Sequence, residues 1–262
     1  MRRPLALAVA AFTAVTLLSA CGSSDGDSAA SVGSDGSALK GEITVFAAAS
    51  LTGSFTELGQ RFETAHPGTK INFSFGPSSG LATQIIAGSP ADVFAAASAK
   101  NMDAVVAAKA ADTPATFAKN VMEIAVPPAN PASVSALADL AKPGVKVALC
   151  AAEVPCGVGA RAVFSNAKLT VRPVTEEVDV KATLTKVQLG EVDAGVVYLT
   201  DVLAAGDKVT GIKIPADVNA STSYPISTLT GSSNAALAKA YVDYVRSRVG
   251  VQTLTAAGFQ KP

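Results

Sequence analysis

The sequence predicts a mixed α/β protein whose folded part has two domains. Apolar residues alternate along the chain between the period of a strand and the period of a helix, which indicates βαβ units and a mainly parallel sheet. Residues 41–262 are enough for two domains of about a hundred residues each. A proline-dense segment at 127–131 separates two series of elements, and we expect the chain to cross between the domains there.

The first series begins with a strand that passes directly into a helix. Ile43, Val45 and Ala47 alternate as the buried positions of a strand do, and the apolar positions after Ser50 recur at helical spacing. The expected elements are a strand over 43–47, a helix over 51–62, a strand over 71–75, a helix from 81, a strand over 91–95, a helix over 99–108 and a strand over 121–126.

The second series leads back toward the first domain. Its expected elements are a helix over 135–140, a strand over 145–149, a helix after 157, a helix over 180–189, a strand over 194–198 and a return strand over 224–229. The chain closes with an amphipathic helix in which Leu237, Tyr241, Val245 and Val249 line one face. If this helix packs on the first sheet, lobe 1 is discontinuous and comprises 41–122 plus 225–262, lobe 2 is 123–224, and two strands form the hinge.

The N-terminal residues have the features of an export signal followed by a tether. A short basic head precedes an apolar run over 4–18, which is shorter than the ~20 residues of a membrane span. The motif Leu18-Ser19-Ala20-Cys21 resembles the bacterial lipobox, in which the cysteine is lipidated. We therefore expect a signal peptide over 1–20, a lipid anchor at Cys21, a flexible tether over 21–40 and a place on the extracytoplasmic face of the cell membrane.

The composition argues against several classes of function. Lys plus Arg equal Asp plus Glu at 21 each and no basic stripe is present, so nucleic acid is not an expected partner. Aromatic residues make up 5% and tryptophan is absent, which argues against an aromatic-lined sugar groove. The single histidine, His66, lies in a helix-ending turn, where we expect a surface residue and no metal site.

Cys150 and Cys156 are expected to form a disulfide. They lie in one short segment, and outside the cytoplasm two such cysteines most often pair. A redox-active pair or a metal site is a weaker interpretation, because no other ligands gather nearby in the sequence.

Two junctions in the first series place hydroxyl groups at the start of a helix. The first strand ends in three alanines, and Ser50 follows them where an N-cap hydroxyl is favoured. The loop Gly76-Pro77-Ser78-Ser79-Gly80 repeats this arrangement, and Ser78 and Ser79 are its better donors because proline has no N–H. Free N–H groups and the positive end of the helix dipole suit an anion at such a place.

Two further junctions lie in the second series. The segment Val154-Pro155-Cys156-Gly157 and the pair Asp179-Val180 each precede or begin a helix. Tyr198 ends a strand, where its phenol can act as one more donor. Taken alone, each of the four junctions also fits an ordinary helix start, and Tyr198 also fits a half-buried core tyrosine.

Together these motifs resemble the molybdate-binding proteins of ABC importers over nearly all of residues 41–262. The resemblance rests on five motifs that occur in one order: Val45-Phe46-Ala47-Ala48-Ala49-Ser50-Leu51-Thr52, Ser78-Ser79-Gly80-Leu81 with Gln84-Ile85, Ala91-Asp92-Val93-Phe94, Val154-Pro155-x-Gly157 and Gly195-Val196-Val197-Tyr198. It implies the two-lobed type II periplasmic-binding-protein fold, with mixed, mostly parallel sheets and a ligand cleft between the lobes.

The resemblance also implies a set of neutral donors around a tetrahedral dianion. Ser50 and Ser78 would give hydroxyl and N–H groups, Cys156 and Val180 their backbone N–H, and Tyr198 its phenol. Cys156 stands where the family often has alanine, and the Gly-Pro-Ser-Ser loop leaves Ser79 open as an additional ligand. The implied ligand is molybdate, with tungstate as a second; the implied partners are an ABC permease and its ATPase. We expect a monomer without cofactor, cation ligands or enzymatic activity.

Three alternatives remain beside this interpretation. The cleft could hold another tetrahedral oxyanion such as sulfate. The loop at residues 76–80 also fits the Gly-x-Ser-x-Gly of a serine hydrolase, but that motif needs a histidine later in the chain and His66 precedes it. A surface lipoprotein that binds only another protein is the third.

Overall fold

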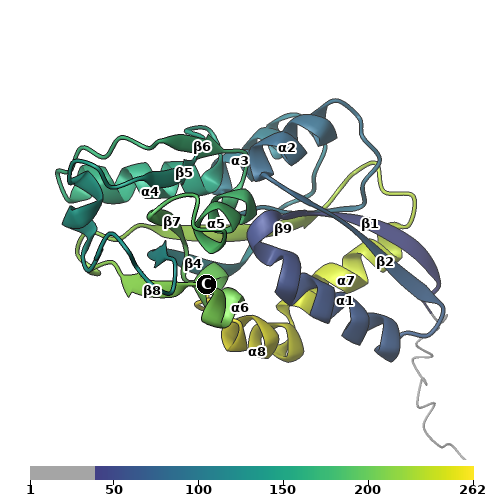
Figure 1. The fold of residues 1–262 in the computed structure, drawn as a ribbon. Helices are drawn as coiled ribbons and strands as arrows, with labels where there is room; N and C mark the ends of the chain where they lie inside the picture. Colours follow the sequence, from purple (N-terminus) through teal and green to yellow (C-terminus); the bar gives the residue numbers. More distant parts are fainter. Residues whose placement is uncertain (1–38) are drawn as a thin grey trace, which may run out of the picture. The chain divides into compact units, whose positions relative to one another are not determined.

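In the part of the chain that the structure describes, residues 39–262, all strands belong to one mixed sheet. This computed structural model gives the strand order β2-β1-β3-β9-β4-β7-β5-β6, with β8 paired to β4 (Figure 1). The predicted signal peptide over 1–20, the lipidation site Cys21 and nearly all of the tether over 21–40 lie outside the described residues.

Strands and helices alternate along the described chain. The strands are β1 (Gly41–Ala48), β2 (Thr69–Gly76), β3 (Val93–Ala95), β4 (Ala115–Val126), β5 (Val147–Cys150), β6 (Thr175–Glu177), β7 (Ala194–Tyr198), β8 (Thr210–Lys213) and β9 (Ser221–Thr228). The helices are α1 (Thr52–Ala65), α2 (Ser78–Ile86), α3 (Ala99–Ala107), α4 (Pro155–Asn166), α5 (Val180–Gln188), α6 (Leu199–Ala205), α7 (Ala235–Arg246) and α8 (Arg248–Ala256), with 3-10 turns η1 (Ala49–Leu51), η2 (Leu137–Ala141) and η3 (Gly206–Lys208). The mixed α/β class predicted from the sequence is confirmed.

The first half of the sheet, which contains β2, β1, β3 and β9, has a helical layer on each face. Successive side chains of a strand point to opposite faces, and along β1 Ile43 and Val45 enter the core formed with α1 and α7, whereas Phe46 enters the core formed with α2 and α3. Figure 1 shows α1 and α7 on one side of β1 and β2, and α2 and α3 on the other. This layering leaves the carboxyl end of β1 open to the second half of the protein.

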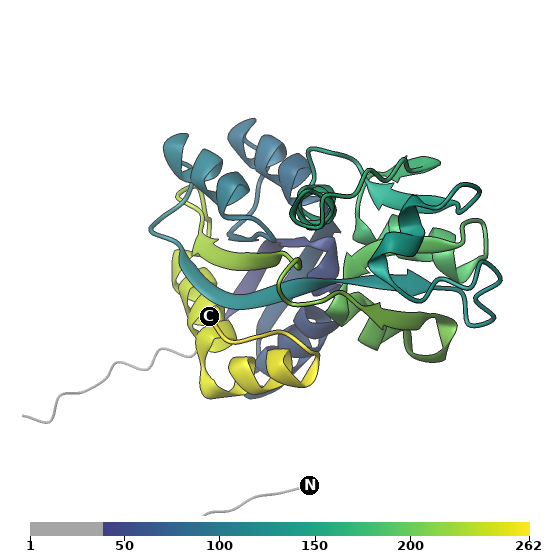
Figure 2. The same cartoon turned by 90° about the vertical axis from the view of Figure 1, so that its left-hand side faces the viewer.

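Strand β4 connects the two halves of the sheet. Its residues from Ala115 to Val121 pair with β9, and those from Met122 to Ala125 pair with β7, all antiparallel. Parallel pairing joins β1 to β2 and β3, and β5 to β6 and β7. Figure 2 shows β4 running through both halves.

Strand β4 thus passes from β9 to β7 before the chain reaches the proline-dense segment at 127–131. The change of partner falls between Val121 and Met122, next to the predicted lobe boundary at 122. Residues Ala38–Pro262 form one compact unit, and the division into lobes at 122 and 224 stays a prediction.

The closing segment is two helices, and the prediction of one continuous amphipathic helix was wrong. Ser247 separates α7 from α8, and its hydroxyl accepts a hydrogen bond from the N–H of Gly250 at 3.4 Å as an N-cap. A Cβ at Gly250 would lie 1.9 Å from the carbonyl oxygen of Val245, so the tight turn needs glycine. Leu237, Tyr241 and Val245 are buried as expected. Val249 is 37% exposed, because it belongs to α8 and does not continue the buried face of α7.

Several smaller elements differ from the sequence-based expectation. The segment predicted as a helix over 135–140 is the 3-10 turn η2, in which one carboxylate oxygen of Asp139 accepts from the N–H groups of Ser135 and Ala136. The short edge strands β6 and β8 and helix α6 were not predicted. Within residues 39–262, no helix has the length and apolar character needed to cross a membrane.

Candidate anion-binding site

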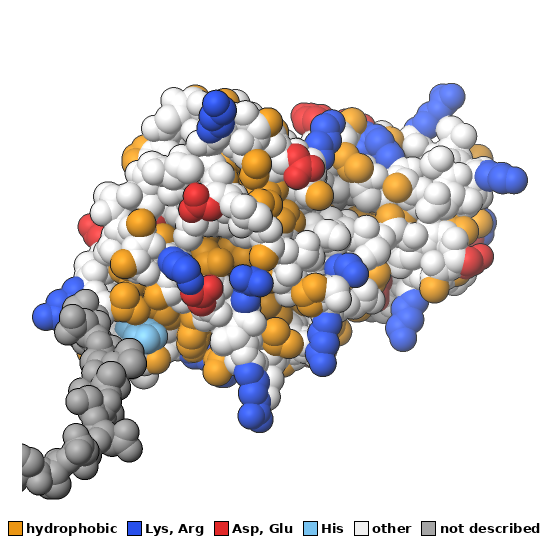
Figure 3. All heavy atoms as spheres, turned by 180° about the vertical axis from the view of Figure 1, so that it is seen from behind, with side chains coloured by type: hydrophobic (Ala, Val, Ile, Leu, Met, Phe, Trp, Pro, Cys, Tyr) orange, Lys and Arg blue, Asp and Glu red, His pale blue; other side chains and the backbone are white. Residues whose placement is uncertain are grey.

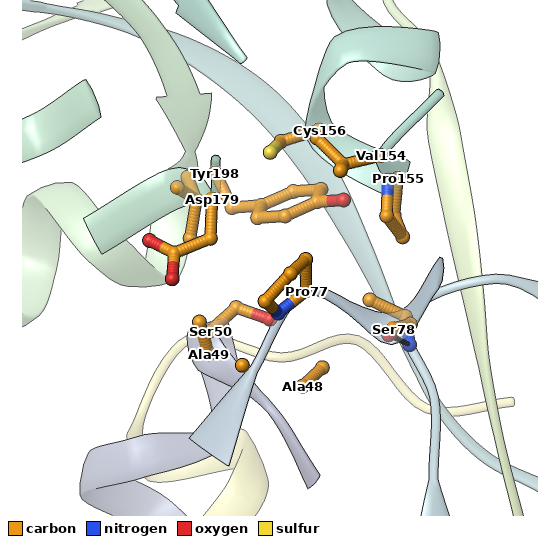
Figure 4. A pocket seen from close by; sticks show the side chains of 13 residues that line it. Ala48, Ala49, Ser50, Pro77, Ser78, Val154, Pro155, Cys156, Asp179 and Tyr198 are labelled. Atoms are coloured by element: carbon orange, nitrogen blue, oxygen red, sulfur yellow. Dashed lines mark hydrogen bonds between the residues drawn. The ribbon is translucent and has the colours of Figure 1, made fainter. Parts of the chain in front are cut away.

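A small cavity lies where residues of β1, η1 and α2 face residues of α4, α5 and β7 (Figure 4). Its lining is Ala48, Ala49, Ser50, Gly76, Pro77, Ser78, Ala97, Val154, Pro155, Cys156, Asp179, Val180 and Tyr198. All five main site residues named from the sequence are in this set. Ser79, which the structure also describes, does not line the cavity. The cavity volume is about 20 Å³, which suits a small ion and is far too small for a sugar or a peptide.

Three helices point their N-termini at the cavity. The first helical hydrogen bond of α2 runs from Leu81 N–H to Pro77, that of α4 from Val158 N–H to Val154, and that of α5 from Thr183 N–H to Asp179. The N–H groups that precede these donors have no acceptor in their own helix. Ser78, Cys156 and Val180 are all among these first residues, so their N–H groups and the helix dipoles favour an anion in the cavity.

Ser50 is not the N-cap that the sequence suggested. It lies inside η1, a 3-10 turn between β1 and α1, and makes no capping hydrogen bond. Its Oγ instead lies 2.9 Å from the hydroxyl oxygen of Tyr224 on β9. A tertiary contact thus fixes the side chain, which lies on the opposite side of the cavity from Cys156 (Figure 4).

Ser78 opens α2, and its hydroxyl oxygen is already an acceptor. The Oγ accepts a hydrogen bond from the N–H of Ala97 at 2.9 Å, and the residue is buried. A serine hydroxyl that accepts in this way keeps its proton for another partner. Because Ser78 lines the cavity, that proton can be donated to an anion there.

Tyr198 presents a buried hydroxyl without a partner. The residue is 1% exposed, and its phenol oxygen has no hydrogen-bond partner among the described residues. Figure 4 shows its ring extending into the space between Cys156 and Pro77. Burial, and to a smaller degree the charge of Asp201, raise the pKa of Tyr198 above its ordinary value; the nearby hydroxyls of Thr222 and Tyr224 lower it in part, although neither makes a hydrogen bond of standard geometry with the phenol. The phenol therefore stays protonated and can act as a donor.

An ion pair behind the cavity holds Tyr198 and α5 in place. The Oδ1 of Asp201 lies 2.8 Å from Nζ of Lys181, the residue after Val180, and its Oδ2 accepts from the N–H of Tyr198 at 3.3 Å. Asp201 has no exposed side-chain surface. Burial raises the pKa of this carboxyl, and Lys181 opposes that rise. One carboxylate thus connects the backbone at Tyr198 with the first turn of α5, where Val180 lies.

The start of α4 is braced by a disulfide between Cys150 and Cys156. Because the sulfur of Cys156 is bonded, the backbone N–H is the donor that this residue can offer. Gly157 permits the close approach of the Cys150–Cys156 loop, since a Cβ there would lie 1.9 Å from the carbonyl oxygen of Ala151. Backbone donors at this helix start are therefore held against the end of β5.

The lining contains hydrogen-bond donors but no Lys or Arg. Its one carboxylate, Asp179, accepts from the N–H of Ala182 at 2.9 Å as the N-cap of α5, and Figure 4 shows it directed away from the Tyr198 hydroxyl. Lys and Arg side chains are spread over the face in Figure 3 and interspersed with Asp and Glu. Within residues 39–262, no group of three His, Cys, Asp or Glu side chains is arranged to hold a metal ion.

His66 lies apart from the cavity and is half-buried, where the sequence suggested a surface position. It follows α1, and its ring lies 4.4 Å from the ring of Phe62, centroid to centroid. The cavity lining thus lacks the histidine that a serine hydrolase requires.

Comparison with known proteins places the chain in a family. The model of the bacterial extracellular solute-binding proteins matches residues 43–260. The chain belongs to this family. The molybdate-binding protein ModA of Mycobacterium tuberculosis H37Rv is 41% identical over 221 residues, which cover 84% of this chain and 85% of that protein.

Two solved structures share the fold of this solute-binding protein. The periplasmic molybdate-binding protein of Azotobacter vinelandii has a TM-score of 0.76 at 20% identity, and the match covers 84% of this chain and 99% of that one. The sulfate-binding protein SubI of M. tuberculosis H37Rv has a TM-score of 0.72 at 17% identity and covers 84% and 86%. The fold is the two-lobed type II periplasmic-binding-protein fold predicted from the sequence.

Sequence reasoning missed three residues that support the cavity. Ala97 donates to Ser78, Tyr224 contacts Ser50, and Asn120 contacts Tyr224 at 3.5 Å. Each lies on a different segment from its partner, so no local pattern indicates the contact. Only the pairing of β4 with β9 brings the last two together.

Proposed function

We propose that this solute-binding protein captures molybdate, and tungstate as a second ligand, and delivers it to an ABC permease. The observation that carries the proposal is the buried Tyr198 hydroxyl, which has no partner among the described residues and faces a cavity of donors. A buried hydroxyl without a partner costs about 1–3 kcal/mol. An anion bound in the cavity would remove that cost. The high identity to a molybdate-binding protein supports the same ligand.

The proposed ligands are Ser50, Ser78, Cys156, Val180 and Tyr198. Each hydrogen bond to a charged acceptor contributes about 1.5–3 kcal/mol. Five to seven such bonds sum to about 8–21 kcal/mol, and the upper part of this range reaches the ~8 kcal/mol of micromolar binding after ordering costs. Neutral donors are therefore sufficient for tight binding of a dianion, without a lysine or arginine in the cavity.

The same donor set selects against anions that carry a proton. Hydrogen phosphate would place its O–H against donors and leave it unsatisfied. Molybdate, tungstate and sulfate carry no proton near neutral pH, so size must separate them. Sulfate is the second candidate ligand, because a sulfate-binding protein shares the fold.

We further propose that the protein acts outside the cytoplasm as a monomer anchored through Cys21, and that it is not an enzyme. Closure of the two lobes around the anion would be the state that the permease and its ATPase recognise. The lipobox-like motif before Cys21 supports the anchor.

Titration calorimetry tests the ligand. The protein is titrated with molybdate, tungstate, sulfate and phosphate in one buffer. We expect one molybdate per chain with micromolar or tighter affinity, similar binding of tungstate, weaker binding of sulfate and no binding of phosphate. Equal affinity for sulfate would overturn the choice of molybdate, and binding of none of the four would overturn the proposed function.

A further inference from the structure

A buried hydrogen-bond chain lies behind Ser50, outside the cavity lining. Tyr224 on β9 and Asn120 on β4 are both 0% exposed. The Tyr224 hydroxyl lies 2.9 Å from Oγ of Ser50 and 3.5 Å from Nδ2 of Asn120. The same Nδ2 donates to Oγ1 of Thr200 at 2.8 Å. The chain thus runs from the two strands that pair across the middle of the sheet to a proposed anion ligand.

The direction of the hydrogen bonds in this chain follows from the chemistry of its groups. The Oδ1 of Asn120 accepts from the N–H of Val121 at 3.0 Å, which turns the NH₂ group toward Thr200 and Tyr224. An amide NH₂ has two protons and accepts none. The Tyr224 oxygen is therefore the acceptor from Asn120. Among the described residues, Ser50 is then the one hydrogen-bond partner left that can accept the proton of Tyr224, so donation from Tyr224 to Ser50 is the arrangement that satisfies this buried hydroxyl. The proton of Ser50 is then left for a group in the cavity.

From this direction we propose that Asn120 and Tyr224 are positioning residues that fix Ser50 as a hydrogen-bond donor to the bound oxyanion. The inference rests on the proposed function, because it assigns a role in binding the same anion. A hydroxyl whose direction is fixed before binding needs no reorientation when the anion enters. Successive donation from Asn120 through Tyr224 also polarises the Ser50 hydroxyl and strengthens its bond to the anion.

A double-mutant cycle on the full chain tests the coupling. Molybdate affinity is measured by calorimetry for the wild type, Tyr224→Phe, Ser50→Ala and the double variant. We expect Tyr224→Phe to weaken binding about tenfold, the lower end of the range seen when outer hydrogen-bond partners are removed at metal sites. We expect the same change to have no effect when Ser50 is already alanine, because the bond it supports is gone.

Tyr241→Phe is the matched control. Tyr241 is also a fully buried tyrosine, but its hydroxyl has no partner among the described residues and it does not line the cavity. The affinity of the Tyr241→Phe variant for molybdate should equal that of the wild type.

A second variant reverses the polarity of the chain. Asn120→Asp keeps the shape of the side chain but replaces the NH₂ donor with an oxygen that accepts, so the proton of Tyr224 turns away from Ser50. Binding should weaken at least as much as in Tyr224→Phe.

The outcomes separate this inference from the proposed function. If the wild type does not bind molybdate, the proposed function fails and this inference fails with it. If the wild type binds but Tyr224→Phe has the same affinity, or weakens binding by the same factor with and without Ser50, only the positioning role is overturned.

Discussion

Replacing Tyr198 with phenylalanine should change affinity and stability in opposite directions. The substitution removes one oxygen atom and keeps the ring that packs 6.1 Å from the ring of Tyr224, centroid to centroid. In the unliganded protein that oxygen is buried and has no partner among the described residues. In the proposed complex it donates to the anion. Most substitutions at a binding residue leave stability unchanged or lower it, so this pair of effects is diagnostic.

The magnitudes follow from the same hydroxyl group. Loss of a donor to a charged acceptor costs about 1.5–3 kcal/mol, which weakens molybdate binding roughly 12- to 140-fold. Removal of an unsatisfied buried hydroxyl relieves up to ~1–3 kcal/mol in the unliganded state. For a chain of this size each kcal/mol corresponds to a shift in Tm of about 2–4 °C. The variant should therefore melt no lower than the wild type without ligand, and lower than the wild type in saturating molybdate.

Calorimetric titration and thermal melting, each with and without molybdate, measure both effects. Tyr241→Phe is the control, because it removes a second buried hydroxyl without a partner among residues 39–262 but outside the cavity. It should melt no lower than the wild type and bind molybdate equally well. The reasoning is refuted if Tyr198→Phe binds molybdate as tightly as the wild type does, or if it lowers the melting temperature of the unliganded protein.

Three further predictions concern the surroundings of the cavity. Ser78→Ala should weaken molybdate binding and also lower the unfolding midpoint in urea, since it leaves the buried N–H of Ala97 without an acceptor; Ser79→Ala should do neither, and equal effects of the two would contradict the assignment. Gly157→Ala should destabilise the protein, because the new Cβ would lie 1.9 Å from a backbone oxygen; an unchanged midpoint would show that the loop can move. Hydrogen bonds from Lys142, Ser135 and Ala136 hold the pKa of Asp139 below its ordinary value, so its carboxylate stabilises the folded state above pH ~4 and this contribution is lost as pH falls. Asp139→Asn should thus lower the urea midpoint at neutral pH, with a difference from the wild type that shrinks in acid; a constant difference would count against this role.

Local patterns in the sequence predicted most of the elements around the cavity. Alternation along residues 43–47 and helical spacing after Ser50 gave β1 and α1, and the strand expected over 194–198 is β7. These elements have strong periodicity because each buries one face or both. The edge strands β6 and β8 are short and contain no buried residue, so they carry no such signal. The break between α7 and α8 depends on a serine cap and a glycine contact that periodicity does not report.

The candidate site was predictable as a set of residues but not as a set of contacts. Helix starts and small polar residues are local features, and they identified the residues that line the cavity from both halves of the protein. The hydrogen-bond partner of each hydroxyl depends on residues that are distant in the sequence. Ser50 was expected to cap a helix, and its hydroxyl instead contacts Tyr224, which is 174 positions away in the chain. Neither partner's sequence surroundings encode that contact.

The claim that neutral donors hold molybdate in this cavity is tested most directly by a crystal structure of the protein grown with molybdate. Diffraction data collected at the molybdenum absorption edge locate the metal atom independently of any interpretation of the site. We predict one anomalous peak per chain, surrounded by Ser50, Ser78, Cys156, Val180 and Tyr198, with the Tyr198 hydroxyl within hydrogen-bond distance of an oxygen atom of the anion. A peak elsewhere, or a cavity without a peak at saturating molybdate, would contradict the account.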